Sequence, residues 1–441
     1  MKRVLPLGVV LRLWIYRILF PLVLIFLLPS MIRRMIKRGH FRRKLGQRFG
    51  YFPEEFQRQL RGKKTVWLQS ISVGETQVAL KIARRWLSRE PEIKIVISVT
   101  TSTGYDLAAR SSSENIHVIY NPIDLASIVR RSLNAVQPAT LVLIEGTWPV
   151  LLAEAWHRHI PVSLVARLSP RSARRFARFR GFAGPFFALL DTVFVQENED
   201  KILWQNLGAK PGAIHCSGAI KYDEPPVPLV LNTELVSILQ NCGVRLEDPI
   251  LLAGSTFLGE EMILTHAYLT LRQKFPNLFL IIVPRHVERT PEIVAELASL
   301  NLKVALRSRP PLSEKPDFLI VNTTGELRDW YAFATVVFIG KSLTSTGGQN
   351  PVEPALLGKP VIFGPHMENF APIVRQWLEN DAAIQISDES ELVAQVERLL
   401  DNPALRENLS SKAIAAISAH FGATERVVNH LISLKSSVTS K

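Results

Sequence analysis

Runs of Val, Ile and Leu without polar alternation recur from Thr65 onward and alternate with stretches of helical period. Such runs are typical of strands that are buried on both faces, as in a parallel sheet covered by helices. The pattern predicts helices over 75–89 and 148–158, and strands over 65–69, 93–99, 141–144, 162–166, 192–195, 250–253, 278–283, 318–322, 336–340, 361–364 and 383–386. We therefore predict an α/β fold with parallel sheets.

Two Rossmann-like, doubly wound domains are the economical arrangement of this pattern. The segment 221–232 contains three prolines and no helical period, so it is the best candidate for a linker. A chain of 441 residues is also about three times the commonest domain size. We expect an N-terminal segment over 1–50 and domains over 51–228 and 229–441, with ligands at the carboxyl ends of the strands that face a cleft.

The most apolar stretch of the chain precedes these domains. Residues 18–29 carry no polar side chain, but they are fewer than the roughly 20 residues that span a bilayer, and Pro21 lies among them. Spanning the membrane, lying in its plane and docking as a buried helix on the body are three readings that stay open. A basic segment over 33–48 follows in place of a small-residue cleavage site, which argues against a secretory signal and places the body in the cytoplasm.

Charge is concentrated at the same end of the chain. Of 53 Lys and Arg residues, 12 lie in residues 1–50 with no Asp or Glu, which leaves 41 basic and 39 acidic residues in the rest. The nearly neutral body argues against a nucleic-acid interface, whereas the basic end suits anionic headgroups. Hydrophobic residues at 47% exclude a disordered chain. The two cysteines, Cys216 and Cys242, form neither a disulfide framework nor a zinc motif, which fits a reducing compartment.

Candidate chemistry lies directly after the predicted strands. Ser72 and Glu75 follow the first strand at the S-x-x-E spacing of a capping box, in which each side chain satisfies a backbone donor at a helix start. The alternative is that Glu75 turns into the cleft and accepts a proton from a substrate hydroxyl. Donors at a helix start lower the pKa of such a carboxylate, and burial raises it.

In the second half, the strand over 336–340 leads into Gly347 and Gly348 and then into Asn350 and Pro351, a good N-cap and first helical residue. This helix start is presented to an anion such as phosphate. Glu353 would repel a phosphate, so its expected ligand is a pair of ribose hydroxyls, with a helix cap as the alternative. Similar glycine turns at 254–256 and 324–326 also follow strands, and three such turns indicate a nucleotide.

Arginine accompanies two further predicted strands. Arg285 and His286, with Arg289 nearby, either bind a phosphate or form a solvated basic turn. The arginine-rich stretch over 167–180 is either a solvated helix face or a surface for an anionic substrate. Phenylalanines at 176, 179 and 182 favour contact with something amphipathic.

An apolar N-terminal stretch and seven motifs follow one another along roughly residues 10–430. The motifs are SVGE at 72–75, ARLSPRS at 166–172, GAIKYD at 218–223, GST with GEE at 254–261, VPRH with ER at 283–289, TGEL at 324–327 and GGQNPVEP at 347–354. In order and spacing they resemble the 3-deoxy-D-manno-octulosonic acid (Kdo) transferases of lipopolysaccharide synthesis. The resemblance implies a two-Rossmann, GT-B glycosyltransferase fold with an acceptor-binding first domain and a CMP-sugar-binding second domain. It further implies CMP-Kdo as donor, a lipid A precursor (lipid IVA) as acceptor, and an inverting reaction at the cell inner membrane without a metal or other cofactor.

The resemblance also implies roles for particular residues. Glu75 becomes the general base, and Lys221 steadies the negative charge that develops on the leaving CMP. Glu145 is a candidate for the stabilising role of a family glutamate. Its position is shifted by one residue from either glutamate of the family motif, because this chain reads LIEGTWP where the family has METELWP. The segments that match those holding CMP contribute Arg285, His286, Thr324, Gly325, Glu326, Asn350, Pro351, Val352 and Glu353. Further departures from the family pattern are Phe257 for His, Asn322 for Asp, Lys341 for Gly and Gln349 for His.

Two other functions stay open on the sequence. One is a sugar transferase with a lipid acceptor and a UDP-linked donor, and the other is a catalytically silent, membrane-associated nucleotide-binding protein. The presence of both Glu75 and Lys221 argues against a catalytically silent protein. The altered segment around Glu145 leaves that alternative open. Because a lipid acceptor resides in the bilayer and CMP-Kdo dissolves in water, we expect the N-terminal segment to hold the protein at an anionic membrane surface.

Overall fold

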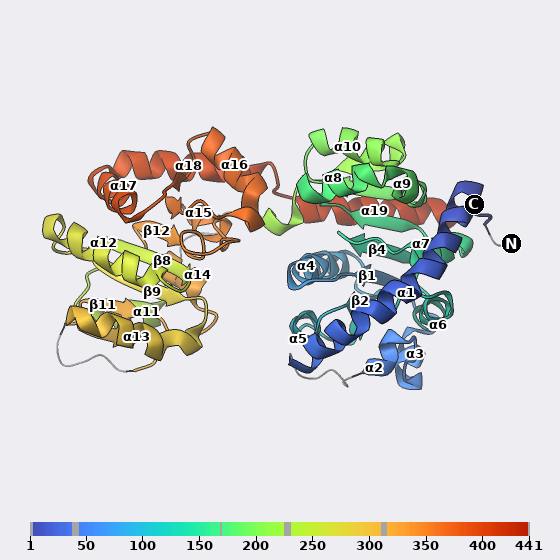
Figure 1. Ribbon diagram of the computed structural model, residues 1–441, viewed down its shortest axis with the longest axis horizontal. Helices are drawn as coiled ribbons and strands as arrows, with labels where there is room; N and C mark the ends of the chain where they lie inside the picture. The colour runs from blue at the N-terminus through green and yellow to red at the C-terminus, as the bar shows by residue number, and fades with distance from the viewer. Residues whose placement is uncertain (1–2, 38–43, 168–169, 225–230, 310–314, 440–441) are drawn as a thin grey trace. The chain divides into compact units, whose positions relative to one another are not determined.

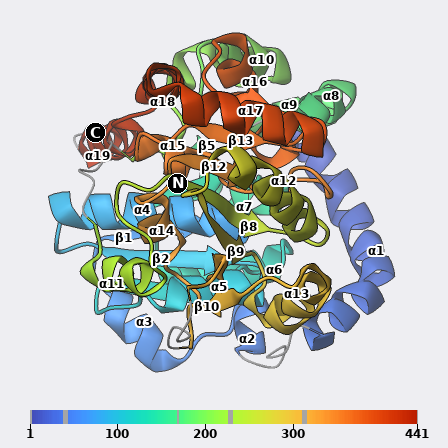
Figure 2. The same cartoon turned by 90° about the vertical axis from the view of Figure 1, so that its left-hand side faces the viewer.

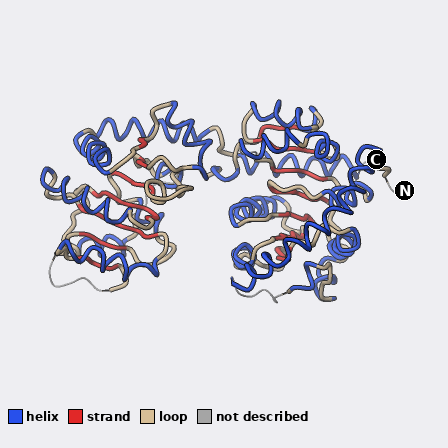
Figure 3. Tube along the Cα trace, viewed as in Figure 1, coloured by secondary structure: helices blue, strands red, loops and turns tan. Residues whose placement is uncertain are grey.

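The computed structural model describes residues 3–37, 44–167, 170–224, 231–309 and 315–439. The chain forms two compact units, Met1–Asp223 with Gly422–Lys441, and Glu224–Phe421 (Figure 1). Each unit contains a seven-stranded parallel sheet flanked by helices (Figure 3). The prediction of two Rossmann-like, doubly wound domains is thereby confirmed. The predicted linker prolines at 225, 226 and 228 lie outside the described residues.

The first sheet has the strand order β3-β2-β1-β4-β5-β6-β7, so the order reverses between β1 and β4. In doubly wound sheets, ligands bind outside the carboxyl ends of the strands at such a reversal. The strands are β1 (Thr65–Gln69), β2 (Lys94–Val99), β3 (Ile116–Tyr120), β4 (Thr140–Ile144), β5 (Val162–Val165), β6 (Thr192–Val195) and β7 (Ile214–Cys216).

Alternate residues of the central strands serve two separate cores, because successive side chains of a strand point to opposite faces. Trp67 packs in one core, and its neighbours Val66 and Leu68 pack in the other. The helices on the Trp67 face are α6 (Ala126–Val136), α7 (Pro149–His157), α9 (Arg180–Phe187) and α10 (Glu199–Leu207). Those on the opposite face are α4 (Val73–Arg89), α5 (Ser102–Ala109) and α19 (Ala423–Thr439). Three further helices of this unit are α2 (Leu45–Arg48), α3 (Glu54–Leu60) and α8 (Pro170–Arg178).

The last helix of the chain, α19, belongs to the first unit, whereas the sequence placed residues 229–441 in one domain. Ala423, Val427 and Leu431 are fully buried in the core that α4 shares. The Asp223 carboxylate accepts hydrogen bonds from the backbone N–H groups of Gly422 and Thr424, both at 2.6 Å. Apolar burial and this cap together fasten the helix to the first unit.

The second sheet has the order β10-β11-β9-β8-β12-β13-β14, with its reversal between β8 and β12. Its strands are β8 (Ile250–Thr256), β9 (Phe279–Pro284), β10 (Val304–Leu306), β11 (Phe318–Ile320), β12 (Val336–Ile339), β13 (Val361–Phe363) and β14 (Ile384–Gln385). Its helices are α11 (Thr233–Asn241), α12 (Glu260–Lys274), α13 (Thr290–Leu297), α14 (Leu327–Tyr331), α15 (Val352–Leu356), α16 (Ala371–Glu379), α17 (Glu389–Asp401) and α18 (Pro403–Ser418).

Helix α1 (Leu7–Lys37) runs along the outside of the first unit (Figures 1 and 2). One face is docked, since Val9 and Leu13 are 1% and 3% exposed and share a core with α7 and α9. Arg12 donates a hydrogen bond to the Gly181 carbonyl of α9. The opposite face is apolar and exposed at Leu7, Leu11, Trp14, Ile15, Ile18, Leu19, Leu22, Val23, Ile25 and Phe26. Within the described residues, the stretch Leu7–Phe26 is the one long and apolar enough to cross a membrane, by length and composition only.

Candidate functional site

The reversal point of the first sheet gathers the three residues that the resemblance placed in catalysis. Glu75 follows β1, Glu145 follows β4, and Lys221 lies in a short 3₁₀ turn, η2 (Ile220–Tyr222), after β7. All three line one cavity of about 80 Å³, together with Arg167. Pockets for whole ligands begin at roughly 300 Å³. This cavity therefore admits a single functional group of a substrate.

Glu75 is both a helix cap and a wall of this cavity. Its Oε2 accepts from the Ile71 N–H at 2.6 Å, and its Oε1 accepts from the Ser72 hydroxyl at 3.0 Å. The Ser72 Oγ in turn accepts from the Glu75 N–H at 3.3 Å, which completes the predicted capping box. Burial nevertheless raises the pKa of the Glu75 carboxyl above its ordinary value, against the lowering effect of these donors. A carboxylate with a raised pKa is a stronger proton acceptor, so the cap and the base are compatible.

Glu145 stands at the end of β4 in a left-handed backbone conformation, with φ of 58°. Its N–H donates to the Val165 carbonyl at 3.0 Å, and Oε1 lies 3.9 Å from Nη1 of Arg167. Partial burial raises the pKa of the Glu145 carboxyl, Arg167 lowers it, and the charge of Glu75 raises it further. Two neighbouring carboxylates thus share the positive charge of Arg167, and the charge of Lys221 also acts on Glu145.

Lys221 is the second cation of the cavity. Lys81 of α4 holds its turn by donating to the carbonyls of Ile220 and Lys221, both at 3.3 Å. Burial and the nearby Arg167 lower the pKa of the Lys221 ammonium to about 8. The group is therefore charged at neutral pH but poorly solvated, which strengthens its interaction with an anion.

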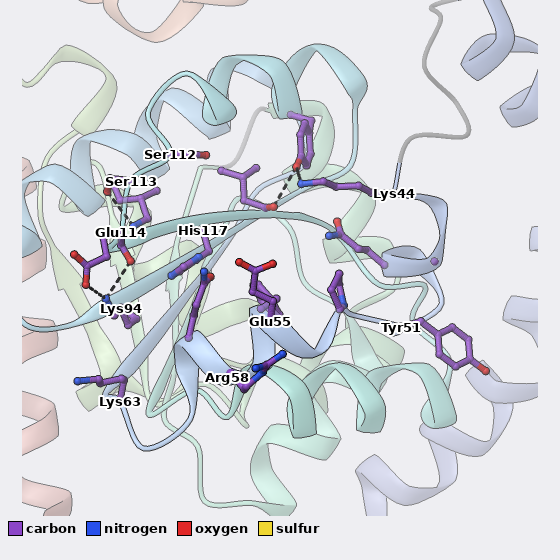
Figure 4. Close-up of a pocket in the computed structure, with 18 residues that line it drawn as sticks. Lys44, Tyr51, Glu55, Arg58, Lys63, Lys94, Ser112, Ser113, Glu114 and His117 are labelled. Atoms are coloured by element: carbon purple, nitrogen blue, oxygen red, sulfur yellow. Dashed lines mark hydrogen bonds and ion pairs between the residues drawn. The ribbon is translucent and has the colours of Figure 1, made fainter.

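A larger cavity of about 880 Å³ lies elsewhere in the first unit, at the free edge of β3 (Figure 4). Glu55 stands in the middle of the view, with Lys94 and His117 on the strand side and Arg58 on α3. The Lys94 ammonium donates to the Glu114 carbonyl, to Oε1 of Glu114 and to Oδ1 of Asn115, so all three of its donors are used. Its size is that of a ligand pocket, but none of the predicted site residues lines it.

In the second unit, the loops after β8 and β12 are joined by one buried carboxylate. Glu260, at the start of α12, accepts from the backbone N–H groups of Phe257, Lys341, Ser342 and Leu343, at 2.7 to 3.0 Å. The side chain is fully buried. Both loops of the reversal point thus keep a fixed shape around one anion, with the glycine turn 254–256 on one side of it.

Arg285 and His286 follow β9, as predicted, and the Arg285 N–H donates to the Thr256 carbonyl at 3.0 Å. His286 lies edge-on to Phe257, with ring centroids 6.1 Å apart, and Nδ1 is 3.4 Å from Oε1 of Glu288. The Lys341 ammonium is 5.4 Å from the Phe257 ring centre. Two of the departures from the family pattern, Phe257 and Lys341, therefore contact each other beside His286.

Thr324 and Gly325 are exposed in the turn after β11, and Gly325 has φ of 94°. Glu326 differs from them, because Arg307 binds both of its oxygens at 3.1 Å and the Thr323 hydroxyl donates to Oε2 at 2.8 Å. Asn322 accepts from the Ser308 N–H and donates to the Ser308 hydroxyl. The side chains of Asn322 and Glu326 therefore fix the turn from within the protein.

Gly347 and Gly348 have φ of 111° and 65°, the conformations for which the sequence pattern predicts glycine. Helix α15 begins at Val352, so Pro351 directly precedes it and Asn350 stands one place earlier. Asn350 accepts from the Val352 N–H at 3.1 Å and donates to Oε1 of Glu353 at 2.9 Å. Glu353 is therefore held by a side chain, and its predicted contact with ribose stays a prediction.

Sequence reasoning left two charged residues of these sites unassigned. Arg167 lies two residues after β5, at the same sheet edge as Glu145. Its position after a predicted strand was the sequence feature that could have identified it as a site residue. Glu260 was quoted only as part of a motif, because its function depends on backbone donors that no sequence pattern displays. Leu168 and Ser169 of the same motif as Arg167 lie outside the described residues. Among the described residues, no group of three or more His, Cys, Asp and Glu is placed to hold a metal ion, and the expectation of a metal-free reaction stays a prediction.

Comparison with known proteins gives two kinds of match. A family model described as 3-deoxy-D-manno-octulosonic-acid transferase (kdotransferase) matches residues 43–224. The 3-deoxy-D-manno-octulosonic acid transferase of Bordetella pertussis is 30% identical over 378 residues, covering 83% of this chain and 86% of the relative. That of Haemophilus influenzae is 28% identical over 402 residues, covering 90% and 92%.

Solved structures match the fold. A glycosyltransferase from Rickettsia africae superposes with a TM-score of 0.55 at 13% identity, covering 86% of this chain and 99% of that chain. A UDP-GlcNAc 2-epimerase from Neisseria meningitidis superposes with a TM-score of 0.58 at 14% identity, covering 84% and 100%. At these identities the likeness concerns the two-domain architecture alone.

Proposed function

The chain belongs to the 3-deoxy-D-manno-octulosonic acid (Kdo) transferase family and is a Kdo-transferring glycosyltransferase, and from this premise we propose that it moves Kdo from CMP-Kdo to lipid IVA, a lipid A precursor, at the cytoplasmic face of the cell inner membrane. The observation that supports the chemistry most is the meeting of Glu75, Glu145, Arg167 and Lys221 in one cavity. Family membership favours this reaction over a UDP-linked donor and over a silent binding protein.

In the proposed reaction, Glu75 takes the proton of the acceptor hydroxyl as its oxygen attacks the anomeric carbon of Kdo. The bond from that carbon to the CMP phosphate breaks, and CMP leaves with the electron pair. Lys221 and Arg167 stabilise the negative charge of the reacting groups, because a buried cation interacts strongly with an anion. Glu145 spaces and orients these two cations through its ion pair with Arg167.

We assign donor binding to the carboxyl edge of the second sheet. Backbone groups of the loops after β8 and β12, held in shape by Glu260, suit the close approach of a phosphate. Arg285 and His286 supply positive charge and a hydrogen-bonding ring, and Glu353 is the proposed partner of the ribose hydroxyls. The side chain of Glu326 is left out of this assignment, since Arg307 already binds it.

For the membrane, the docking of α1 supports an orientation in the bilayer plane. The segment from Val9 to Arg17 is held on the protein, and among the described side chains only the nine residues of 18–26 continue as an apolar stretch with no buried member. That is about half of the roughly 20 residues needed to cross. The exposed apolar face of α1 would enter the interfacial layer, and the exposed arginines 174, 175 and 178 of α8 would meet anionic headgroups.

Two cations of the basic segment 33–48 are bound to the first unit and are less available to this surface. Residues 38–43 lie outside the described residues. Lys44 donates to the Tyr105 hydroxyl, and Arg48 donates to the Thr100 carbonyl at 2.8 Å and lies 4.2 Å from the Tyr120 ring centre. Both side chains are thus engaged with the first unit.

The reaction is tested by incubating the full chain with CMP-Kdo and a tetra-acylated lipid A precursor in detergent, followed by mass spectrometry of the product. We expect the mass of the acceptor to rise by one or more Kdo units. Calorimetric titration with CMP, UDP and ADP identifies the donor class, and preference for CMP is expected. An unchanged acceptor, or tighter binding of UDP than of CMP, would contradict the proposal.

The membrane assignment needs a variant that spares the docked face of α1, because removing residues 1–31 would also delete the buried Val9 and Leu13. Leu22→Gln with Phe26→Gln changes only exposed positions. Flotation with anionic vesicles should show weaker binding, and transfer to detergent-dispersed acceptor should stay within about twofold of the wild type. Full binding to vesicles by this variant would reject the assignment.

A further inference from the structure

Helix α7 is capped by a residue from another element. Its N-cap position is Trp148, whose side chain makes no cap hydrogen bond. Asp124, in the loop after β3, does so instead: Oδ2 accepts from the Val150 N–H at 3.0 Å, and Oδ1 accepts from the Leu151 N–H at 2.9 Å. Asp124 is 2% exposed. A buried carboxylate on the first free donors of a helix fixes where that helix begins.

The same carboxylate is bound from helix α1. The Tyr16 hydroxyl and the Arg17 guanidinium both lie close enough to Asp124 to act on its carboxylate. Arg17 also lies 3.9 Å from Glu154 of α7, which Arg130 binds at 2.9 Å. Helix α1 therefore contacts both the cap of α7 and the helix itself.

Helix α7 begins directly after the loop that carries Glu145. In that loop, a Cβ atom on Gly146 would lie 2.5 Å from Cδ1 of Ile71, so Gly146 packs closely against the Ile71 side chain. The N–H of the same Ile71 donates to the Glu75 carboxylate. A displacement of the start of α7 would therefore move Gly146 against Ile71 and disturb the hydrogen bond that holds Glu75.

We infer that Tyr16 and Asp124 are positioning residues that connect the docked helix α1 to the reacting carboxylate, through the start of α7, Gly146 and Ile71. Neither residue touches the cavity of Glu75. The inference rests on the proposed function, and it adds a second role to α1: the helix proposed to lie in the membrane also sets the geometry of the site. Transfer should then depend on the docking of α1 even when the acceptor is dispersed in detergent.

The test compares Tyr16→Phe, Asp124→Asn and the double variant with the wild-type chain, using detergent-dispersed acceptor. Tyr105→Phe is the matched control, because it also removes a buried tyrosine hydroxyl of the first unit, one that donates to the Val118 carbonyl at 3.3 Å. We expect kcat to fall about threefold for Tyr16→Phe and about tenfold for Asp124→Asn, with unchanged affinity for CMP. Because Tyr16 acts through Asp124, the double variant should match Asp124→Asn.

Hydrogen exchange of the peptide over 145–152 supplies a readout that needs no turnover. Exchange at the amides of Val150 and Leu151 should be faster in both single variants and unchanged in Tyr105→Phe. Unchanged exchange in Tyr16→Phe, additive losses in the double variant, or a loss of kcat in Tyr105→Phe equal to that in Tyr16→Phe would each overturn the inference. A wild-type chain that transfers no Kdo would count against the proposed function alone, and the exchange data would still decide the connection from α1 to α7.

Discussion

At the carboxyl edge of the first sheet, Glu75 and Glu145 line a cavity with Arg167 and Lys221, and burial raises the pKa of both carboxyls. At the same edge of the second sheet, Glu260 accepts four backbone N–H groups and Glu326 is bound at both oxygens by Arg307. The first edge keeps charges close together and poorly solvated. At the second edge, the carboxylates hold the loops in shape, and the backbone of these loops is available to bind a ligand.

The two units share one fold, but this difference suits the two sheet edges to different tasks. Proton transfer needs a group whose charge is easily changed, and burial supplies it. Binding of a nucleotide needs loops of fixed shape. A buried carboxylate whose oxygens accept several backbone hydrogen bonds holds the loops in that shape. The consequence is that removing a carboxylate should affect turnover in the first unit and ligand binding in the second.

The largest effect is expected for Glu75→Gln. Glutamine keeps the length of the side chain but cannot accept the proton, so turnover should fall by about 10²-fold or more while CMP binding is retained. Initial rates and calorimetry on one preparation measure both. The matched variant is Ser72→Ala, which removes the cap but keeps the carboxylate and should cost about 0.5–2 kcal/mol of stability with turnover largely intact. Normal turnover in Glu75→Gln would reduce Glu75 to a helix cap.

Glu260→Ala should act on binding. Four buried N–H groups lose their acceptor, so we expect affinity for CMP to fall by a factor of about 30 and the free energy of unfolding to fall by about 3 kcal/mol. Asp317→Asn is the control, because this carboxylate pairs with Arg272 at the opposite, amino end of β11. It should lower the melting temperature and leave CMP affinity unchanged. Equal losses of affinity in both variants would remove the contrast between the two edges.

A pH profile sharpens the description of the first edge. The pKa of Lys221 is about 8, so the ammonium is charged below that value, and kcat should fall about tenfold as the pH rises from about 7 to about 9. In Lys221→Arg the charge persists and this limb should move to higher pH. Because the folded pKa lies below the ordinary 10.5, the contribution of this group to the stability of the fold rises between about 8 and 10.5, and thermal melts at each pH separate the limb from unfolding. If the fall of kcat occurred at the same pH in Lys221→Arg, it would belong to the titration of another group.

The smallest effect is expected for Glu353→Gln. If Glu353 binds the ribose hydroxyls, CMP should lose about fivefold in affinity, and 2′,3′-dideoxy-CMP, which has already lost those partners, should lose almost nothing. Calorimetric titration of both ligands gives the comparison. Losses of the same size would show that Glu353 supports Asn350 and does not contact the ligand.

The central strands of both sheets were predictable from the sequence, whereas three of the edge strands were not. All the strands predicted from unbroken apolar runs are present, because the runs reflect burial on both faces. The three strands without a prediction, β3, β7 and β10, each lie at an edge of a sheet. The runs of β3 and β7 are interrupted by His117 and His215, since one side of an edge strand is less enclosed, and β10 has only three residues.

The site shows the same limit. The position of Glu75 after a strand followed from the sequence, as did the capping box around it, whereas Lys221 was identified only through the family resemblance, because β7 was not predicted. That burial dominates the pKa of Glu75 did not follow, because it depends on residues brought together from β4, β5 and η2. Likewise, Asp124 was not recognised as the cap of α7, since it lies 26 residues before the donor that it binds. Long-range hydrogen bonds leave no spacing pattern in a sequence.

The return of α19 to the first unit makes the second unit, in topology, an insertion between Asp223 and Gly422. During synthesis, the sheet of the first unit emerges from the ribosome first, but the helix that packs against α4 and against Phe194 on one of its faces emerges last. Domains that are contiguous in sequence fold in the order of their synthesis. Here the inserted unit is complete while the surrounding one still exposes apolar surface. A nascent chain paused before residue 422 should therefore bind a chaperone through its first unit and not through its second.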